Sequence, residues 1–399
     1  MRMLFLTPDV PLPADQGAKL RTIGVIRAAA RFHQVDVLSF AGTDTAAGNG
    51  AVDLADLCRQ VRLVDPPPPR PAIRRAAALL FDPLPDIAHR LESEEYRSAL
   101  WDQLGHETYH AIQIEGLEMM PYLPTARSAG KRASIIYDAH NAEMALQRTI
   151  FQAELRNPRR LHAGLYSLAQ WSKLGTYERV MMNEADAVIA VSTADATKLR
   201  GRHVEPEIIP NGVDTAALSF REPRTGGHTL LFVGTLDYRP NADAAHWLVE
   251  RILPGIRRVR PDVRLRLVGR GAERFHAEGV DAIGYVDDVA AELERADVMV
   301  VPLRMGGGTR FKVLEAMAVG LPVVSTPVGL QGIDAEPERH ALVAHAPADF
   351  AGATLRILDD HALAQRLARD ARKLIEERYA WGVVAPRYVA LLSRLRRRR

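Results

Sequence analysis

The 399-residue chain has little cysteine, little lysine and no long apolar run. Its single cysteine, Cys58, excludes a framework of internal disulfides and suits a reducing cytoplasm. No apolar stretch approaches the roughly 18 residues that a membrane-spanning helix needs. The opening segment MRMLFLTPDVPLP has an apolar run that is too short, and too interrupted by proline, for a signal peptide. We therefore expect a soluble cytoplasmic protein that is at most attached to a membrane surface.

Nearly all the cations are arginine, because only six of the 52 basic residues are lysine. The formal net charge is a modest +3, but basic clusters occur at 66–75 (PPPPRPAIRR), at 157–160 (NPRR) and in the final SRLRRRR. Such clusters suit an anionic membrane surface or nucleic acid, and they equally suit an arginine-rich surface that faces water. We expect no nucleic-acid partner.

Strand-like and helix-like segments alternate twice along the chain, which is long enough for two domains. Strands that alternate with helices predict α/β domains in which helices cover both faces of a parallel sheet. The polar stretch SFREPRTGGH (219–228) separates the two series. We therefore place one domain at 1–218 and a second at 219–379. The amphipathic segment at about 380–399 needs an apolar surface, and we expect it to pack back onto the first domain.

A glycine-rich stretch, RMGGGTRFKVLEAMAVGLPVV (304–324), lies between an expected strand at 297–303 and an expected helix at 310–319. Glycines let a backbone approach an anion, and a helix start offers free N–H groups. Arg310 and Lys312 add two positive charges, so the stretch suits a diphosphate. The Gly-Lys-Ser/Thr ending of a nucleotide-hydrolase loop is missing. A plain glycine turn before a core helix remains the alternative.

Glu315 lies about a turn and a half into the same expected helix. Its carboxylate could accept hydrogen bonds from the two neighbouring hydroxyls of a ribose. A surface glutamate is the alternative for this position.

Taken together, these motifs resemble those of the retaining GT-B glycosyltransferases of bacterial cell-surface polysaccharide synthesis, which are glycosyltransferase family four-like. The second half carries the resemblance in PNGVD (210–214), LLFVG (230–234), RLRLVGRG (264–271), IGYVDDV (283–289) and LEAMAVGLPVVSTPVGLQGI (314–333). The first half matches more loosely in PLPADQGAKLRT (11–22), YDAHNAE (137–143) and ADAVIAVS (185–192). The resemblance implies a GT-B fold, in which two doubly wound Rossmann-like domains face a central cleft. It also implies transfer of a sugar from a nucleoside-diphosphate sugar to a hydroxyl, with retention of anomeric configuration.

The resemblance assigns most donor-side roles to the second half. The family's ribose-binding glutamate matches Glu315, whereas its partner glutamate, which touches the donor sugar, falls on Gly307. The loop GTLDYRPNAD (234–243) has only Arg239 where relatives have an Arg and a Lys, so we expect Arg310 and Lys312 to supply the diphosphate charge and act in catalysis. The other positions expected to bind the donor are Gly17, Gly234, Thr235, Arg270, Val286, Gly308 and Thr309.

In the first half, His140 matches the family's cleft histidine near the reacting sugar, and we expect it to be catalytic. Arg21 is interpreted either as a contact for an anionic acceptor or as a solvated helix residue. Glu115 ends an expected strand and is predicted to face the cleft on the acceptor side. The expected partners are a nucleotide sugar and a sugar or lipid-linked acceptor.

We expect no cofactor and no metal, because the family works without a bound metal and the cleft motifs contain no Asp-x-Asp pair. Two alternatives stay open. One is a catalytically degenerate GT-B protein that binds a nucleotide sugar or a partner enzyme, which Gly307 favours. The other is a nucleotide-sugar epimerase on the same fold.

Two segments of the first half have the pattern of interfacial helices. In PRPAIRRAAALLF (69–81), Ile73, Ala76, Ala77 and Leu80 fall along one side, and Arg70, Arg74 and Arg75 fall largely elsewhere. In the second segment, Arg156, Arg159 and Arg160 precede Leu161, Leu165, Leu168 and Trp171 at helical spacing. We expect peripheral attachment to the inner face of the plasma membrane; two ordinary core helices are the alternative.

Overall fold

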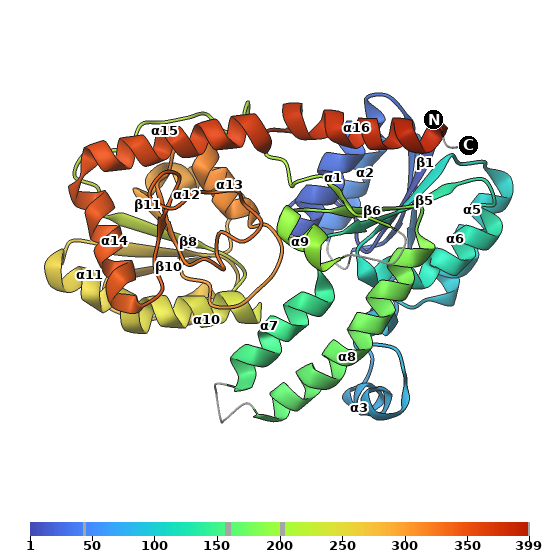
Figure 1. The fold of residues 1–399 in the computed structure, drawn as a ribbon, viewed down its shortest axis with the longest axis horizontal. Coiled ribbons are helices and arrows are strands. Elements are labelled where there is room, and N and C mark those ends of the chain that lie inside the picture. Colours follow the sequence, from blue (N-terminus) through green and yellow to red (C-terminus); the bar gives the residue numbers. More distant parts are fainter. Residues whose placement is uncertain (43–44, 156–160, 200–203, 398–399) are drawn as a thin grey trace. The chain divides into compact units, whose positions relative to one another are not determined.

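A computed structural model describes residues 1–42, 45–155, 161–199 and 204–397. Its contacts divide the chain into unit 1, Met1–Pro210 with Val384–Arg399, and unit 2, Asn211–Val383 (Figure 1). The division falls before the predicted boundary at 218, because the segment after Pro210 pairs within unit 2. Val213 bridges to Ala380, and its N–H donates to the carbonyl of Tyr379 at 2.8 Å.

Unit 1 is built on a parallel sheet with the strand order β3-β2-β1-β4-β5-β6-β7. Its strands are β1 (Arg2–Thr7), β2 (Gln34–Phe40), β3 (Gln60–Val64), β4 (Ala111–Glu115), β5 (Ser134–Ala139), β6 (Ala187–Ala190) and β7 (Glu207–Ile208). Its helices are α1 (Gly17–Ala30), α2 (Thr45–Ala55), α3 (Ala72–Phe81), α4 (Asp86–Arg90), α5 (Glu94–His106), α6 (Leu123–Ala129), α7 (Glu143–Leu155), α8 (Leu161–Glu184), α9 (Thr193–Lys198) and most of α16 (Trp381–Arg397). Strands β4 and β5 are buried along their whole length, so their polar residues Gln113, Glu115 and Asp138 need partners inside the protein.

Unit 2 has a second parallel sheet, with the order β10-β9-β8-β11-β12-β13. Its strands are β8 (Thr229–Val233), β9 (Arg264–Val268), β10 (Val280–Gly284), β11 (Val298–Val301), β12 (Val323–Ser325) and β13 (Leu342–Val343). Its helices are α10 (Arg239–Trp247), α11 (Leu253–Val259), α12 (Val289–Arg295), α13 (Phe311–Ala318), α14 (Pro347–Asp359) and α15 (His361–Arg378). The two doubly wound α/β domains predicted from the alternating pattern are thus confirmed.

The helical region that begins with α10 is divided in the structure. A π-helical segment, Leu248–Ile252, separates α10 from α11. Pro254 lies in the first turn of α11, and its ring lacks the N–H that would continue a regular helical ladder.

The last helix, α16, buries the apolar stripe that its sequence predicts. Tyr388, Leu391, Leu392 and Leu395 are all less than a tenth exposed. The Tyr388 hydroxyl also donates to Gln113 Oε1 on β4, at 2.5 Å. The end of the chain is therefore part of the core of unit 1.

In each sheet the first strand of the unit lies in the middle. Strand β1 pairs with β2 on one side and β4 on the other, and β8 pairs likewise with β9 and β11. The chain therefore winds toward one edge of the sheet and then toward the other. Ligands of open α/β sheets bind outside the carboxyl ends of the strands at this topological switch point. A ligand site is therefore expected in the loops after β1 and β4, and in those after β8 and β11.

A close approach of two loops beside the unit 2 switch point yields a stability prediction. Gly269 has φ +131°, and a Cβ added to it would lie 2.1 Å from the carbonyl oxygen of Gly234. We expect Gly269→Ala to lower the free energy of unfolding by about 1–3 kcal/mol. Gly352 is the matched control, because it is exposed within α14 and nothing lies within 4 Å of its added Cβ. Gly352→Ala should be neutral or stabilise by up to about 1 kcal/mol. Equal effects of the two substitutions in urea unfolding would contradict this view of the loops.

Candidate active site

The loop between β11 and α13 is shaped by its glycines and by Arg310. Gly306 has φ +137° and Gly308 has φ +70°, which are conformations that favour glycine. A guanidinium nitrogen of Arg310, Nη1, donates to the carbonyl of Gly307. A Cβ added to Gly306 would lie 2.2 Å from Arg310 Nη2, so the loop closes directly over this side chain. Arg310 therefore shapes the loop, which adds a structural task to the charge expected of it.

Helix α13 starts at this loop without a side-chain cap on its first turn. The Val313 N–H donates to Arg310 O at 3.0 Å, and the positive end of the helix dipole at this start favours an anion. Lys312 lies in the first turn, and its Nζ is 3.0 Å from Glu315 Oε2. The structure therefore brings three predicted features together: the glycines, the two cations and Glu315.

The loop after β8 lies beside the loop after β9. The N–H of Gly234 donates to Val268 O at 2.9 Å, and the N–H of Leu236 donates to Arg270 O at 2.7 Å. Thr235 O accepts from the Asn241 side chain at 3.0 Å, and Arg239 opens α10 immediately afterwards. The predicted donor-side residues Gly234, Thr235, Arg239 and Arg270 therefore gather at two neighbouring strand ends.

Two other predicted donor residues are less well placed. Val286 follows β10, an edge strand two places from β8, and it packs against the apolar core. Thr309 is nearly buried, and its hydroxyl donates to Gly332 O at 3.4 Å. The structure therefore does not bring Val286 to the switch point, and it gives Thr309 a structural partner.

Sequence reasoning missed Arg304, which fixes the start of the glycine-rich loop. Its Nη2 is 2.6 Å from Asp243 Oδ1 and its Nε is 2.9 Å from Oδ2, so the pair is bidentate. The guanidinium also lies 5.2 Å from the ring centre of Trp247. Both partners belong to α10, 57 to 61 residues earlier in the chain, so no local pattern reveals them.

In unit 1, Gly17 is the exposed first residue of α1, in the connection that follows β1. Its place at the β1 switch point agrees with a ligand-contacting position. Arg21, one turn later, is buried instead.

Arg21 is neither solvated nor placed to bind an acceptor, which corrects both sequence interpretations. The side chain is 1% exposed and pairs with the fully buried Asp138, with Nη2–Oδ1 at 2.8 Å. Its Nε lies 3.0 Å from each Asp138 oxygen, and Nη1 donates to Ile209 O at 3.0 Å. A buried charge needs such partners, because desolvating it costs several kcal/mol. Arg21 therefore joins α1 to β5.

Glu115, which was predicted to face the cleft on the acceptor side, is fully buried and so is not open to a ligand. Its Oε2 lies 2.9 Å from His140 Nε2, and the His140 side chain is 13% exposed. The structure thus joins two residues that sequence reasoning treated separately. Glu115 is therefore a buried partner of the predicted catalytic histidine.

The pair Glu115–His140 changes the acidity of both groups. Burial by itself disfavours the imidazolium, but the hydrogen bond and the charge of Glu115 outweigh it and raise the pKa of His140. Burial likewise disfavours the Glu115 carboxylate, but the hydrogen bond and charge of His140 lower the pKa of Glu115.

Glu178 was also missed by the sequence reasoning. It lies on α8, and its Oε1 accepts the N–H of Glu143 at 2.8 Å, at the start of α7. Because α7 begins just after His140, this contact helps to fix the histidine's segment. Burial raises the pKa of the Glu178 carboxyl to about 7.

One group of side chains within the described part of the chain has the composition of a metal site: Glu115, Asp138 and His140, whose ligand atoms lie within 4.8 Å of one another. Those atoms already have other partners. Both Asp138 oxygens accept from Arg21, and both Glu115 oxygens accept from protein donors. A cation would have to displace the Arg21 guanidinium, so the residues do not fit a metal. The motif IGYVDDV (283–289) contains two adjacent aspartates. The second, Asp288, caps α12.

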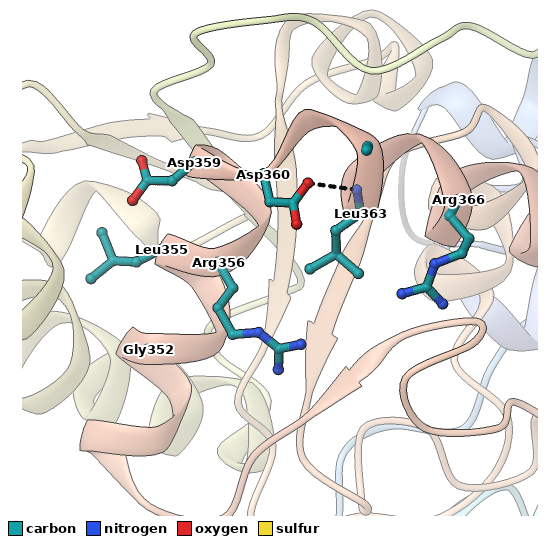
Figure 2. A pocket seen from close by; sticks show the side chains of 8 residues that line it. Gly352, Leu355, Arg356, Asp359, Asp360, Leu363 and Arg366 are labelled. Atoms are coloured by element: carbon teal, nitrogen blue, oxygen red, sulfur yellow. Dashed lines mark hydrogen bonds between the residues drawn. The ribbon is translucent and has the colours of Figure 1, made fainter.

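A hollow of about 710 Å³ lies elsewhere in unit 2, where α14 meets α15 (Figure 2). Arg356 in its lining forms an ion pair with Glu338 at 3.0 Å, and Asp360 caps α15 through the N–H of Leu363 at 2.9 Å. It contains none of the predicted site residues, and its charged groups have structural partners.

Two family models match the chain, one in each of its two halves. Residues 17–217 match the model of Glycosyltransferase Family 4, and residues 227–360 match that of Glycosyl transferases group 1. The first match covers half of the chain.

Two curated relatives match part of the chain. The glycogen synthase of Mycobacterium tuberculosis is 33% identical over 245 residues, which are 56% of this chain and 58% of that protein. The phosphatidyl-myo-inositol mannosyltransferase of Mycobacterium leprae is 33% identical over 192 residues, which are 44% of this chain and 50% of that protein. The chain thus spans little more than half the length of the curated relatives it matches.

Solved structures match over the whole chain. Anabaena HepE in complex with UDP-glucose has a TM-score of 0.68 and 16% identity, with 99% of this chain and 100% of that one covered. Sucrose-phosphate synthase from Thermosynechococcus elongatus has a TM-score of 0.71 and 18% identity, with both chains fully covered. The fold is therefore that of the GT-B glycosyltransferases. The chain belongs to glycosyltransferase family 4, as its motifs indicated.

The Glu115–His140 pair predicts a pH-dependent contribution to stability. The raised pKa of His140 gives stability that is complete below its ordinary value of 6.5 and is lost as the pH rises through the folded value. The lowered pKa of Glu115 gives stability that is present above its ordinary value of 4.5 and is lost as the pH falls through the folded value. Urea unfolding of wild type and Glu115→Gln should therefore differ most between pH 4.5 and 6.5. A difference that does not change with pH would contradict the ionic pairing.

Proposed function

We propose that the protein transfers a sugar from a nucleoside-diphosphate sugar to a hydroxyl acceptor, with retention of anomeric configuration. The observation that supports this most is the glycine-rich loop and the uncapped start of α13 at the switch point of unit 2. The proposal agrees with the printed functions of the relatives, a glycogen synthase and a mannosyltransferase. It also agrees with the UDP-glucose held by HepE.

The chemistry that this proposal asks of unit 2 is stabilisation of a leaving diphosphate. Negative charge grows on that group as the glycosidic bond to the donor breaks, so fixed donors and cations lower the barrier directly. Backbone N–H groups of the loop and of α13 are such donors, and Arg310 and Lys312 supply the positive charge. Glu315 holds the ribose through the carboxylate oxygen that Lys312 leaves to a ligand. No metal takes part in the proposed reaction.

A second candidate function is nucleotide-sugar binding without transfer, which Gly307 favours, because relatives have a glutamate at that position. Incubation of donor with and without simple sugar and lipid acceptors separates the two. Transfer that needs acceptor and survives EDTA supports the first function. Donor binding with no turnover toward any acceptor supports the second. Conversion of the donor alone to its epimer would overturn both.

We further propose that the acceptor belongs to a cell-surface glycan or glycolipid, reached by peripheral attachment to the inner face of the plasma membrane. No helix among the described residues is both long and apolar enough to cross a bilayer. Helix α3, however, exposes Ile73 by 80% and Phe81 by 85%, the two largest exposed fractions among the big apolar side chains of the described residues. Arg74 and Arg75 are exposed on the same helix. These four residues are called the α3 surface below.

Polar contacts hold α3 in place from its other side. Lys173 Nζ on α8 donates to Ala78 O at 3.0 Å, and Arg70 pairs with Asp86 at 3.2 Å. Arg70 is only 25% exposed in this pair and is not part of the α3 surface, whereas Arg75 stays 51% exposed although it also lies 3.6 Å from Asp86. Arg156, Arg159 and Arg160, the cations of the second predicted segment, lie outside the described residues. Leu168 of that segment is 40% exposed, and Trp171 stacks on Phe151 with ring centres 6.4 Å apart.

Glu315 provides a test of the donor site. We expect Glu315→Ala to weaken binding of the nucleoside-diphosphate sugar by roughly 1.5–3 kcal/mol, the range for hydrogen bonds to a charged group. Calorimetry with the matching 2′-deoxy nucleotide should show the same weakening in the wild type and little further loss in the variant. Equal affinity of the wild type for the two nucleotides would remove Glu315 from the ribose.

The α3 surface predicts membrane binding that depends on lipid charge. Each arginine near an anionic surface contributes about 1 kcal/mol, and the contribution falls off within a Debye length. Co-sedimentation should therefore show binding to vesicles that contain phosphatidylglycerol, release by salt, and a marked loss for the double variant Ile73→Ser/Phe81→Ser. Trp101→Ser on α5 is the control, because Trp101 is 57% exposed on another helix. Equal binding to neutral vesicles, or equal loss with the control, would end this proposal.

A further inference from the structure

We propose that Tyr388 and Gln113 are positioning residues for His140, which they reach through the carboxylate of Glu115. In this arrangement α16, which carries Tyr388, fixes which ring nitrogen of His140 holds the proton that is donated to Glu115. The inference rests on the proposed function only where it gives His140 a part in sugar transfer. The hydrogen-bond chain itself can be measured in the free protein.

The chain begins at the histidine ring. Nε2 of His140 lies 2.9 Å from Oε2 of Glu115. A carboxylate only accepts hydrogen bonds, so Nε2 carries a proton. Within the described residues, no hydrogen bond to Nδ1 of His140 was found, and the side chain retains 13% exposure. Nδ1 is therefore the ring nitrogen left for a ligand.

Glu115 is kept ionised and oriented by further donors. The Thr22 hydroxyl donates to Oε2 at 3.0 Å, and the Gln113 side-chain amide donates to Oε1 at 2.7 Å. Because Glu115 is fully buried, these bonds replace water. A carboxylate with three donors has little freedom to rotate, so its geometry is passed on to the histidine.

The orientation of the Gln113 amide depends on both of its ends. At one end its nitrogen faces two carboxylates, Glu115 at 2.7 Å and Asp138 at 3.5 Å, and only an NH₂ group suits that position. The amide oxygen then faces Tyr388, which must donate to it, and the two oxygens are 2.5 Å apart. Burial raises the pKa of the Tyr388 phenol, so it stays protonated and remains a donor. Tyr388 therefore fixes Gln113 in the orientation that Glu115 requires.

Other charges also act on His140 and remain when Tyr388 is changed. They are Asp138 on β5, Arg21 on α1 and Glu143 at the start of α7. Asp138 favours the imidazolium and Arg21 opposes it. A change at Tyr388 leaves these three groups in place, so its effect on the ring passes through Gln113, which contacts Glu115 at 2.7 Å and, more weakly, Asp138 at 3.5 Å.

The experiment compares two tyrosines that each lose one buried hydroxyl. Tyr388→Phe breaks the proposed chain. Tyr96→Phe is the matched control, because Tyr96 is also fully buried in unit 1 and donates to a protein oxygen, Leu38 O, at 2.6 Å. Ring ¹⁵N shifts of His140, assigned with His140→Gln, are followed from pH 5 to 9 in wild type, both tyrosine variants and Glu115→Gln. Thermal unfolding shows that each variant is folded.

We expect the wild-type ring to be protonated on Nε2, with a titration midpoint above that of an ordinary histidine. Glu115→Gln should lower the midpoint strongly and mix the tautomers. Tyr388→Phe should lower it less but clearly, and Tyr96→Phe should leave it unchanged. A Tyr388→Phe spectrum equal to the wild type, or equal effects of the two tyrosine variants, would overturn the proposal.

Transfer kinetics separate this inference from the proposed function. If transfer occurs, Tyr388→Phe should lower kcat roughly ten- to hundredfold with little change in the donor KM, and move the pH profile in the direction of the NMR midpoint. A change in KM alone would contradict a positioning role. If no transfer is detected but the ring signals move as expected, the proposed function fails and the hydrogen-bond chain stands.

Discussion

The structure depends on the central position of the first strand in each sheet. Successive crossovers carry the chain from β1 to β3, and the chain then returns to the other side of β1 at β4. Unit 2 repeats the arrangement around β8, with β11 on the returning side. This order brings connections far apart in sequence to the same edge of a sheet. In unit 2 these are the loop that begins at Gly234 and the glycine-rich loop.

The second constraint is the burial of charge in unit 1. Arg21, Asp138, Glu115 and His140 come from three elements, and three of the four are fully or almost fully buried. Such a network is stable only when every member has partners, because an unpaired buried charge costs several kcal/mol. Here each charge has partners. The same requirement holds His140 in place, because the loss of any one partner would leave a buried charge unpaired.

The sequence predicted those parts of the molecule whose signals are local. Alternating apolar segments marked the strands and predicted the two α/β domains that the structure has. The glycines, Arg310, Lys312 and Glu315 lie within ten residues of one another, so their proximity could be predicted as well.

Contacts between residues that are far apart in the sequence could not be predicted. Arg21 and Asp138 are 117 residues apart, and Gln113 and Tyr388 are 275 apart, so nothing in either local segment announces its partner. Arg21 was therefore misjudged as a residue open to solvent or acceptor. The position of Val286 after an edge strand could not be predicted for a related reason: a motif aligns residues along the chain, whereas the strand order decides which strand ends are neighbours.

The central claim is that the glycine-rich loop and the start of α13 hold a diphosphate. The most direct measurement is calorimetric titration of a panel of nucleoside diphosphates against the corresponding monophosphates, in wild type and in Arg310→Ala. We expect clearly tighter binding of the diphosphate in the wild type, and a smaller preference for it in the variant. Equal affinity for mono- and diphosphates in the wild type, or a preference that Arg310→Ala leaves unchanged, would contradict it.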